Sequence, residues 1–254
     1  MSLQTMTVDG VDLHERFGVY IDTSLIFNKP KKDVEVISIP GRDSALIVDY
    51  GTFQNFVLTV PCFMKDDNAL DFADRYTLLI DFLGSIRNYV RIRFSNEPAH
   101  FRIGYPIMGQ APTIKRLNRE GRFDLSFNCR PFRYLRNGEQ AIAIDESPKE
   151  IINPTEFDAL PFIDIYGYGR LEIFSGSVGG AQIEIAQHPS GFIRINSENM
   201  TITGNLPHPY KASDYVTIIT GGYPRLLPGE NTIITDSTIF SPTSSAIYPR
   251  WREL

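Results

Sequence analysis

The sequence predicts a mainly β protein, with an N-terminal antiparallel β domain covered by one α-helix and a C-terminal β-sandwich. Three observations predict this class. Residues 123–130 alternate apolar and polar side chains, as a strand with one buried face does. Residues 68–85 repeat apolar side chains every three or four positions, as an amphipathic helix does. In the second half, glycines separate short apolar runs at near-regular spacing, which is typical of a sandwich.

Two hairpins are predicted in the first half. Asp9-Gly10 lies between two short strand-like runs, and Asp-Gly suits the positive φ angles of a tight turn. A second hairpin-like excursion covers residues 33–50 and turns at Pro40-Gly41. Proline presets φ for the second position of such a turn, and glycine tolerates positive φ at the third.

One helix is predicted between the strands of the first half, over residues 68–85. The polar residues 66–68 offer N-terminal capping chemistry, and Gly84 suits the end of the helix. Its apolar face consists of Leu70, Ala73, Tyr76, Leu79, Ile80 and Leu83. A helix that follows and precedes antiparallel strands predicts a helix-covered sheet.

The second half is predicted to be all β. Its expected strands are residues 161–166, 170–174, 181–186, 191–195, 215–220 and 230–235. The turn signal at 136–140 and the polar, acidic stretch at 145–150 suggest a boundary between domains. We therefore expect an N-terminal domain of residues 1–136, a linker of residues 137–152 and a C-terminal sandwich of residues 153–254.

The residues show no catalytic, cofactor-binding or metal-binding pattern. The four histidines are scattered without metal-ligand spacing, and no nucleophile elbow or phosphate loop occurs. Cys62 and Cys129 are the only cysteines, and two buried thiols are expected in preference to a disulfide. The sequence does not show whether they lie close together. No apolar run is long enough to cross a bilayer, so no membrane insertion is expected.

Basic residues are concentrated in one stretch of the first half. Residues 87–136 carry 11 Lys or Arg and three acids, whereas the whole chain has a net charge of −5. A solvated strand face and a surface that meets an acidic neighbour both agree with this pattern. Specific nucleic-acid binding is not expected, because no DNA-binding fold is visible.

Three short motifs carry a family resemblance. They are Ser38-Ile39-Pro40-Gly41-Arg42-Asp43, the run from Asn153-Pro154 to Gly167-Tyr168-Gly169, and the ending Tyr248-Pro249-Arg250-Trp251-Arg252-Glu253-Leu254. In this order and spacing, and with a helix in the right interval, the set resembles the distal tail (Dit) proteins of long-tailed bacteriophages. The resemblance covers nearly the whole chain.

The resemblance implies a structural hub and no enzymatic activity. Such proteins form a homohexameric ring, or two rings back to back, that joins the tail tube to the tail-tip or host-adsorption proteins and lets the genome pass. The implied partners are the major tail-tube protein, a tail-tip or tail-associated lysin protein, and in some phages a receptor-binding protein. The C-terminal sandwich would resemble galectins or carbohydrate-binding modules. The implied location is the virion, at the tail tip or baseplate, after assembly in the host bacterial cytoplasm.

Two sets of residues are expected to matter for assembly. The hairpin tip is predicted to contact a neighbouring subunit through Pro40, Gly41, Arg42 and Asp43. Structural turns and anchors are predicted at Asn153, Pro154, Pro161, Gly167 and Trp251. As an anchor, Trp251 would pack the chain end onto a domain or a neighbour, and the last residues can pack back on the N-terminal domain.

One alternative function stays open. A β-sandwich with exposed aromatic side chains can act as a lectin-like carbohydrate-binding module in host attachment. The candidate side chains for a sugar platform are Tyr166, Tyr168, Tyr210, Tyr215 and Tyr223. A glycan hydrolase would need two positioned carboxylates, and the sequence singles out no such pair.

Overall fold

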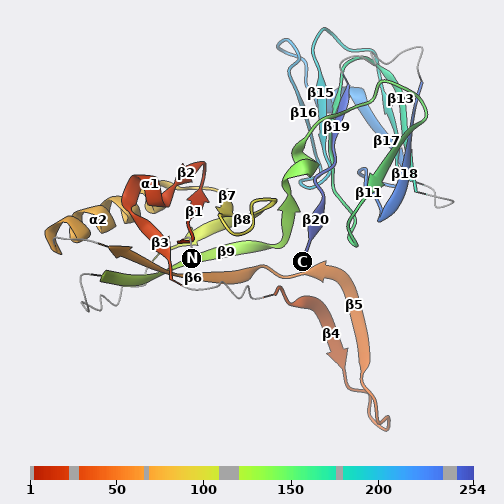
Figure 1. The fold of residues 1–254 in the computed structure, drawn as a ribbon. Helices are drawn as coiled ribbons and strands as arrows, with labels where there is room; N and C mark the ends of the chain where they lie inside the picture. The colour runs from red at the N-terminus through yellow and green to blue at the C-terminus, as the bar shows by residue number, and fades with distance from the viewer. Residues whose placement is uncertain (1–2, 23–28, 66–68, 109–119, 176–179, 237–244) are drawn as a thin grey trace. The chain divides into compact units, whose positions relative to one another are not determined.

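The chain folds as two compact units, residues 1–133 with Leu254 and residues 134–253 (Figure 1). This computed structural model describes residues 3–22, 29–65, 69–108, 120–175, 180–236 and 245–254. Strands predominate in both units, so the predicted mainly β class is confirmed. Among the described helices, none has the length and apolar character needed to cross a membrane.

The first unit is built around one antiparallel sheet. Its elements are β1 (Met6–Val8), β2 (Val11–Asp12), α1 (Leu13–Phe17), β3 (Val19–Ile21), β4 (Lys32–Ile37), β5 (Leu46–Phe53), β6 (Phe56–Lys65), α2 (Ala69–Ser85), β7 (Val90–Phe94), β8 (His100–Ile107) and β9 (Glu120–Leu135). The strand order in the main sheet is β2-β1-β7-β8-β9-β6-β3. The sheet is so strongly curled that its two ends approach each other. Gln4, just before β1, forms a β-bridge with Ile21 of β3.

The core of the first unit follows from the alternation seen in the sequence. In β9, Phe123, Leu125, Phe127 and Cys129 are buried, whereas Arg122 and Asp124 between and beside them are exposed. β6 pairs with β9 along its whole length and buries Leu58, Val60 and Cys62 in the same core. Helix α2 adds Phe72, Leu79 and Leu83 to this core. Residues 66–68, which were predicted to cap α2, lie outside the described residues.

The N-terminal hairpin is confirmed, and a short helix follows it. β1 and β2 pair across Asp9-Gly10, whose φ angles are +50° and +80°. Helix α1 was missed in the sequence because five residues are too few for a periodic pattern. Asp12 caps α1 by accepting hydrogen bonds from the backbone N–H groups of His14 (2.8 Å) and Glu15 (3.2 Å).

The second unit is a sandwich of two five-stranded antiparallel sheets. One sheet has the order β10-β19-β12-β15-β16 and the other β11-β18-β13-β14-β17. The elements of the second unit are η1 (Arg136–Glu139), β10 (Ile142–Ala143), β11 (Lys149–Asn153), β12 (Phe162–Ile165), β13 (Gly169–Phe174), β14 (Gln182–Ile185), β15 (Ile193–Asn196), β16 (Thr201–Gly204), η2 (Ala212–Tyr215), β17 (Val216–Thr220), β18 (Gly229–Thr235), β19 (Ala246–Tyr248) and β20 (Arg252–Glu253). The last of these strands, β20, pairs with β9.

The sandwich core is rich in isoleucine. Inward side chains of both sheets form one buried cluster that includes Ile163, Ile165, Leu171, Ile173, Ile183, Ile193, Ile233 and Ile247. Residues 137–152, which the sequence suggested as a linker, contain most of η1, all of β10 and the start of β11, so they are part of this unit. Ile144 and Ile151 from this stretch are buried in the core. The stretch resembled a linker because residues 145–150, between these two isoleucines, are mostly polar and charged.

Candidate functional site

Strands β4 and β5 form a hairpin that belongs to no larger sheet. They pair with each other and with no other described strand. From residue 31 to residue 55, no residue is buried. A two-stranded hairpin without a core is at best marginally stable in water. The exposed hairpin is therefore the candidate interaction site of the first unit.

The tip of the hairpin contains the first motif. Gly41 has a φ of +82°, and the backbone N–H of Arg42 donates to the carbonyl oxygen of Ile39 at 3.1 Å. With Pro40 at the second position and Gly41 at the third, this is the geometry of a type II turn. Pro40, Gly41, Arg42 and Asp43 are all exposed. Their part in an oligomer interface stays a prediction.

Polar side chains connect the two strands near the base of the hairpin. Lys32 forms an ion pair with Asp49, and the Tyr50 hydroxyl donates to Glu35 Oε2 at 2.6 Å. The carboxylate of Asp33 accepts from Thr52 (3.3 Å) and Gln54 (3.2 Å). The bond from Lys32 and a second from the Gly51 N–H lower the pKa of Asp49. These cross-strand contacts order the hairpin, and an ordered surface has a lower entropy cost of binding than a disordered one.

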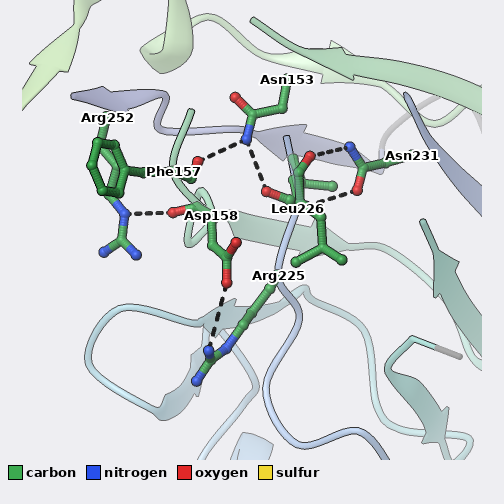
Figure 2. A network of polar contacts seen from close by, with 8 residues as sticks. Asn153, Phe157, Asp158, Arg225, Leu226, Asn231 and Arg252 are labelled. Atoms are coloured by element: carbon green, nitrogen blue, oxygen red, sulfur yellow. Dashed lines mark hydrogen bonds and ion pairs between the residues drawn. The ribbon is translucent and has the colours of Figure 1, made fainter. Parts of the chain in front are cut away.

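The second motif begins with an asparagine that holds two loops together (Figure 2). Asn153 is 2% exposed, and its amide N–H groups donate to the carbonyl oxygens of Phe157 and Leu226, each at 2.9 Å. Its Oδ1 accepts from the Thr155 backbone N–H at 3.0 Å and from the Thr155 hydroxyl at 2.8 Å. One buried side chain thereby satisfies four polar groups, two of them carbonyls on loops far apart in the sequence.

The same network continues through Asn231 and Arg252 (Figure 2). Asn231 accepts from the Leu227 N–H at 2.9 Å and donates to the Leu227 carbonyl at 2.8 Å. Arg252 donates from Nε to the carbonyl oxygen of Asp158, whose carboxylate lies 3.7 Å from Arg225. Burial lowers the pKa of Arg252. The network ties the second motif to the chain end.

The other predicted turn residues occupy different surroundings. Pro154 is exposed, whereas Pro161 is buried and its carbonyl oxygen accepts from the Ser197 N–H at 3.1 Å. Gly167 has a φ of +124°, a conformation that favours glycine, and its carbonyl oxygen lies 2.8 Å from His188 Nε2. The structure therefore brings Asn153 close to the chain-end network, but it does not gather all five predicted residues at one site.

Trp251 lies in the core of the second unit, where it is 5% exposed. The backbone beside it is fixed by two hydrogen bonds, from Arg250 N to Gly138 O (2.7 Å) and from Leu135 N to Trp251 O (3.0 Å). A Cβ on Gly138 would lie 2.5 Å from the Trp251 backbone nitrogen, so only glycine fits at this position. The third motif thus closes the sandwich.

Sequence reasoning missed the ion pair that accompanies this closure. Arg250 and Glu198 are both largely buried and lie 3.0 Å apart between Nη2 and Oε2. The Tyr134 hydroxyl donates to Glu198, and the Arg250 guanidinium lies 4.4 Å from the centre of the Phe162 ring. Arg250 belongs to the third motif, Tyr248 to Leu254. Nothing local marks Glu198, because its partners are more than 50 residues away in sequence.

The cysteines and basic residues do not form a reactive centre in the described part of the chain. Cys62 and Cys129 are free and buried, and burial raises the pKa of Cys129 to about 12. The described residues contain no group of three or more potential metal ligands. The described members of the basic stretch are dispersed: Arg122 pairs with Asp22 at 2.7 Å, and Arg102 is buried. Three further members, Lys115, Arg116 and Arg119, lie outside the described residues.

Comparison with known families defines the class of the first unit. Residues 11–129 match the family described as the phage tail protein RIFT-related domain. This segment contains most of the curled sheet, from β2 into β9, together with the exposed hairpin and helix α2. The first unit is therefore similar to this family of phage tail domains. No curated protein matches the chain.

Solved structures extend the likeness to the whole chain. The crystal structure of the Dit protein of phage SPP1, described as a hub of the adsorption apparatus of phages that infect Gram-positive bacteria, matches with a TM-score of 0.72 and 18% identity over all of both chains. Two structures of the activated phage p2 baseplate match with TM-scores of 0.57 and 0.58, at 8% and 9% identity, over at least 97% of each chain. The chain has the fold of a siphophage distal tail protein, and the predicted family resemblance is confirmed.

Proposed function

We propose that this chain is a structural hub of a phage tail tip or baseplate. In this role, copies of the chain form a homohexameric ring, or two rings back to back. The ring joins the tail tube to the tail-tip, tail-associated lysin or receptor-binding proteins, and the genome passes through it. Assembly would occur in the bacterial cytoplasm, and the ring would remain in the virion.

The main support is that the whole chain, and not one unit alone, has the fold of the SPP1 hub protein. The exposed β4–β5 hairpin also supports assembly. It has no core of its own, so its apolar side chains become buried only when another surface covers them. A closed ring uses a heterologous contact, in which one surface of each subunit meets a different surface of the next. A hairpin that extends from one subunit to another provides such a contact.

The solution mass of the purified protein tests the proposal. Size-exclusion chromatography with light scattering should give six or twelve times the mass of one chain, and the mass should fall on dilution. A strict monomer at high concentration, alone and with a purified tail-tube protein, would contradict the proposed ring.

The predicted contact at the hairpin tip has its own test. The double variant Arg42→Ala, Asp43→Ala removes two exposed charges without changing the turn residues Pro40 and Gly41. We expect it to dissociate at a higher concentration than the parent protein. An unchanged mass over the whole dilution series would exclude the tip charges from the interface.

Glycan binding by the sandwich is the second candidate function. The structure brings aromatic rings from several loops into contact: Tyr166 with Phe192 (5.4 Å between centroids) and Tyr210 with Tyr215 (6.4 Å). Tyr166 is 36% exposed and Tyr210 is 50% exposed. Exposed rings with polar ends are suited to amphipathic ligands such as sugars. A glycan array with the parent and a Tyr166→Ala, Tyr210→Ala variant tests this function, and parent binding that the variant lacks would support it.

A further inference from the structure

The β4–β5 hairpin carries apolar side chains on both of its faces. Cross-strand partners share a face, and neighbours along one strand point to opposite faces. Val36 lies opposite Ile47, and with Val34 they form the first face. Ile37 lies opposite Leu46, and with Val48 they form the apolar part of the second face. Each face also has one acid, Asp49 opposite Val34 and Glu35 opposite Val48. Five of these six side chains are exposed, and Val48 is half-buried.

A strand exposed on one side normally alternates apolar and polar residues. Strands that are covered on both sides instead show continuous apolar runs. The hairpin has such runs, Val36-Ile37 in β4 and Leu46-Ile47-Val48 in β5. Because the described residues of the chain cover neither face, the pattern indicates that two surfaces from elsewhere cover the hairpin.

The chain itself presents a suitable surface. Along β8, Arg102, Gly104 and Pro106 are buried, so the residues between them point outward. This outer strip includes Ile103, Tyr105 (40% exposed) and Ile107 (39% exposed). An insert and an apolar receiving strip on one chain allow the contact to repeat from copy to copy, as a ring requires.

We propose that the hairpin is a two-sided insert, with both faces buried by neighbouring copies of this chain. The outer strip of β8 is part of the surface that receives one face. This inference rests on the proposed ring, but it specifies more: a flap lying on one subunit would leave either Val36 and Ile47 or Ile37 and Leu46 in water.

Single cysteines on adjacent residues distinguish the two arrangements. Leu46→Cys and Ile47→Cys place thiols on opposite faces, and Ile152→Cys places a control thiol at a β11 position that is 65% exposed, like Ile47. Native Cys62 and Cys129 are buried and should contribute little background. The rate of labelling by a maleimide is measured for each variant in two states. The first is the oligomer, with its mass verified by light scattering, and the second is the monomer obtained by dilution.

We expect the Leu46→Cys and Ile47→Cys thiols to react at least about tenfold more slowly in the oligomer than in the monomer, because reaction then requires local opening. Ile152→Cys should react equally fast in both. Protection at only one of the two hairpin positions would overturn the two-sided insert while leaving the ring intact. An oligomer in which both positions stay reactive would remove the hairpin from the interface. A parent protein that never associates would contradict the ring itself.

The receiving strip is tested separately. Tyr105→Lys puts a charge on the outer face of β8, and Tyr168→Lys makes the same change at a position of equal exposure (41%) in the second unit. We expect Tyr105→Lys to dissociate at a higher concentration than Tyr168→Lys. Equal dissociation would show that β8 does not receive the hairpin.

Discussion

Val36 and Ile47 face each other across β4 and β5, and they are 64% and 65% exposed. A cross-strand pair of branched apolar residues normally stabilises a sheet by burying its surface. This pair leaves most of its surface in water, so its apolar character contributes little to the folding of the single chain. The proposed association would bury this pair.

Replacing this pair should therefore separate folding from assembly. We expect Val36→Thr, Ile47→Thr to change the free energy of unfolding of the monomer by no more than about 0.5 kcal/mol, because both sites are exposed. The same variant should weaken oligomerisation. Urea unfolding at low concentration and light scattering at high concentration measure the two effects, and a clear loss of monomer stability would refute this view of the pair.

Asn153→Ala should destabilise the second unit. It removes the amide that bonds to the carbonyls of Phe157 and Leu226 and to the N–H of Thr155, at a cost of about 2–4 kcal/mol. Trp251, the only tryptophan, is buried in this unit, so its fluorescence reports the unfolding. Asn199→Ala, at an exposed position, is the matched control and should stay within about 0.5 kcal/mol.

Glu198 and Arg250 should be strongly coupled. Glu198→Ala leaves a buried guanidinium without its ion-pair partner, which costs about 3–5 kcal/mol. In the double variant with Arg250→Ala this buried charge is gone, so the loss should be clearly smaller than the sum of the single losses. Additive losses in a double-mutant cycle, followed by Trp251 fluorescence, would mean that the pair is not coupled.

Gly138→Ala should be destabilising, whereas Gly84→Ala should not. The new Cβ at Gly138 would overlap the Trp251 backbone nitrogen at 2.5 Å, and the resulting shift costs about 1–3 kcal/mol. At Gly84, near the end of α2, the Cβ would make an ordinary contact with Met108 at 3.7 Å. Alanine there should be neutral or stabilising by up to about 1 kcal/mol. Thermal unfolding followed by circular dichroism compares the two variants.

The Lys32–Asp49 contact predicts a pH dependence of the hairpin. Because Lys32 lowers the folded-state pKa of Asp49, the contact stabilises the hairpin above the unfolded pKa of about 3.9 and is lost as pH falls through the lower folded pKa. An NMR titration of the Asp49 carboxyl should show a higher pKa in Lys32→Gln than in the parent. Lys31→Gln, which changes a neighbouring exposed lysine, should leave the titration unchanged.

Elements with a local signal could be predicted from the sequence. The alternation of Phe123, Leu125 and Phe127 predicted β9, and the three- and four-residue spacing predicted α2. The turn at Pro40-Gly41 and the hairpin at Asp9-Gly10 followed from the φ preferences of their residues. Helix α1 escaped prediction because it is only one turn long.

Contacts between distant residues could not be predicted in the same way. Asn153 was identified as a turn residue, but its bond to Leu226 depends on a strand-like bridge between Ala159 and Leu226. The stretch 137–152 looked like a linker because its charges are local, whereas the burial of Ile144 and Ile151 depends on strands β18 and β19.

The β-rich class, the principal helix and the main turns could be predicted, because each depends on the backbone preferences and periodicity of neighbouring residues. Which apolar segments enter a core depends on the three-dimensional arrangement of the strands and helices. Leu125 and Phe127 of β9 are buried by partner strands and α2, whereas the apolar run Leu46-Ile47-Val48 pairs, among the described strands, with β4 alone. Burial depends on what lies against a side chain in space, and sequence periodicity does not contain that information.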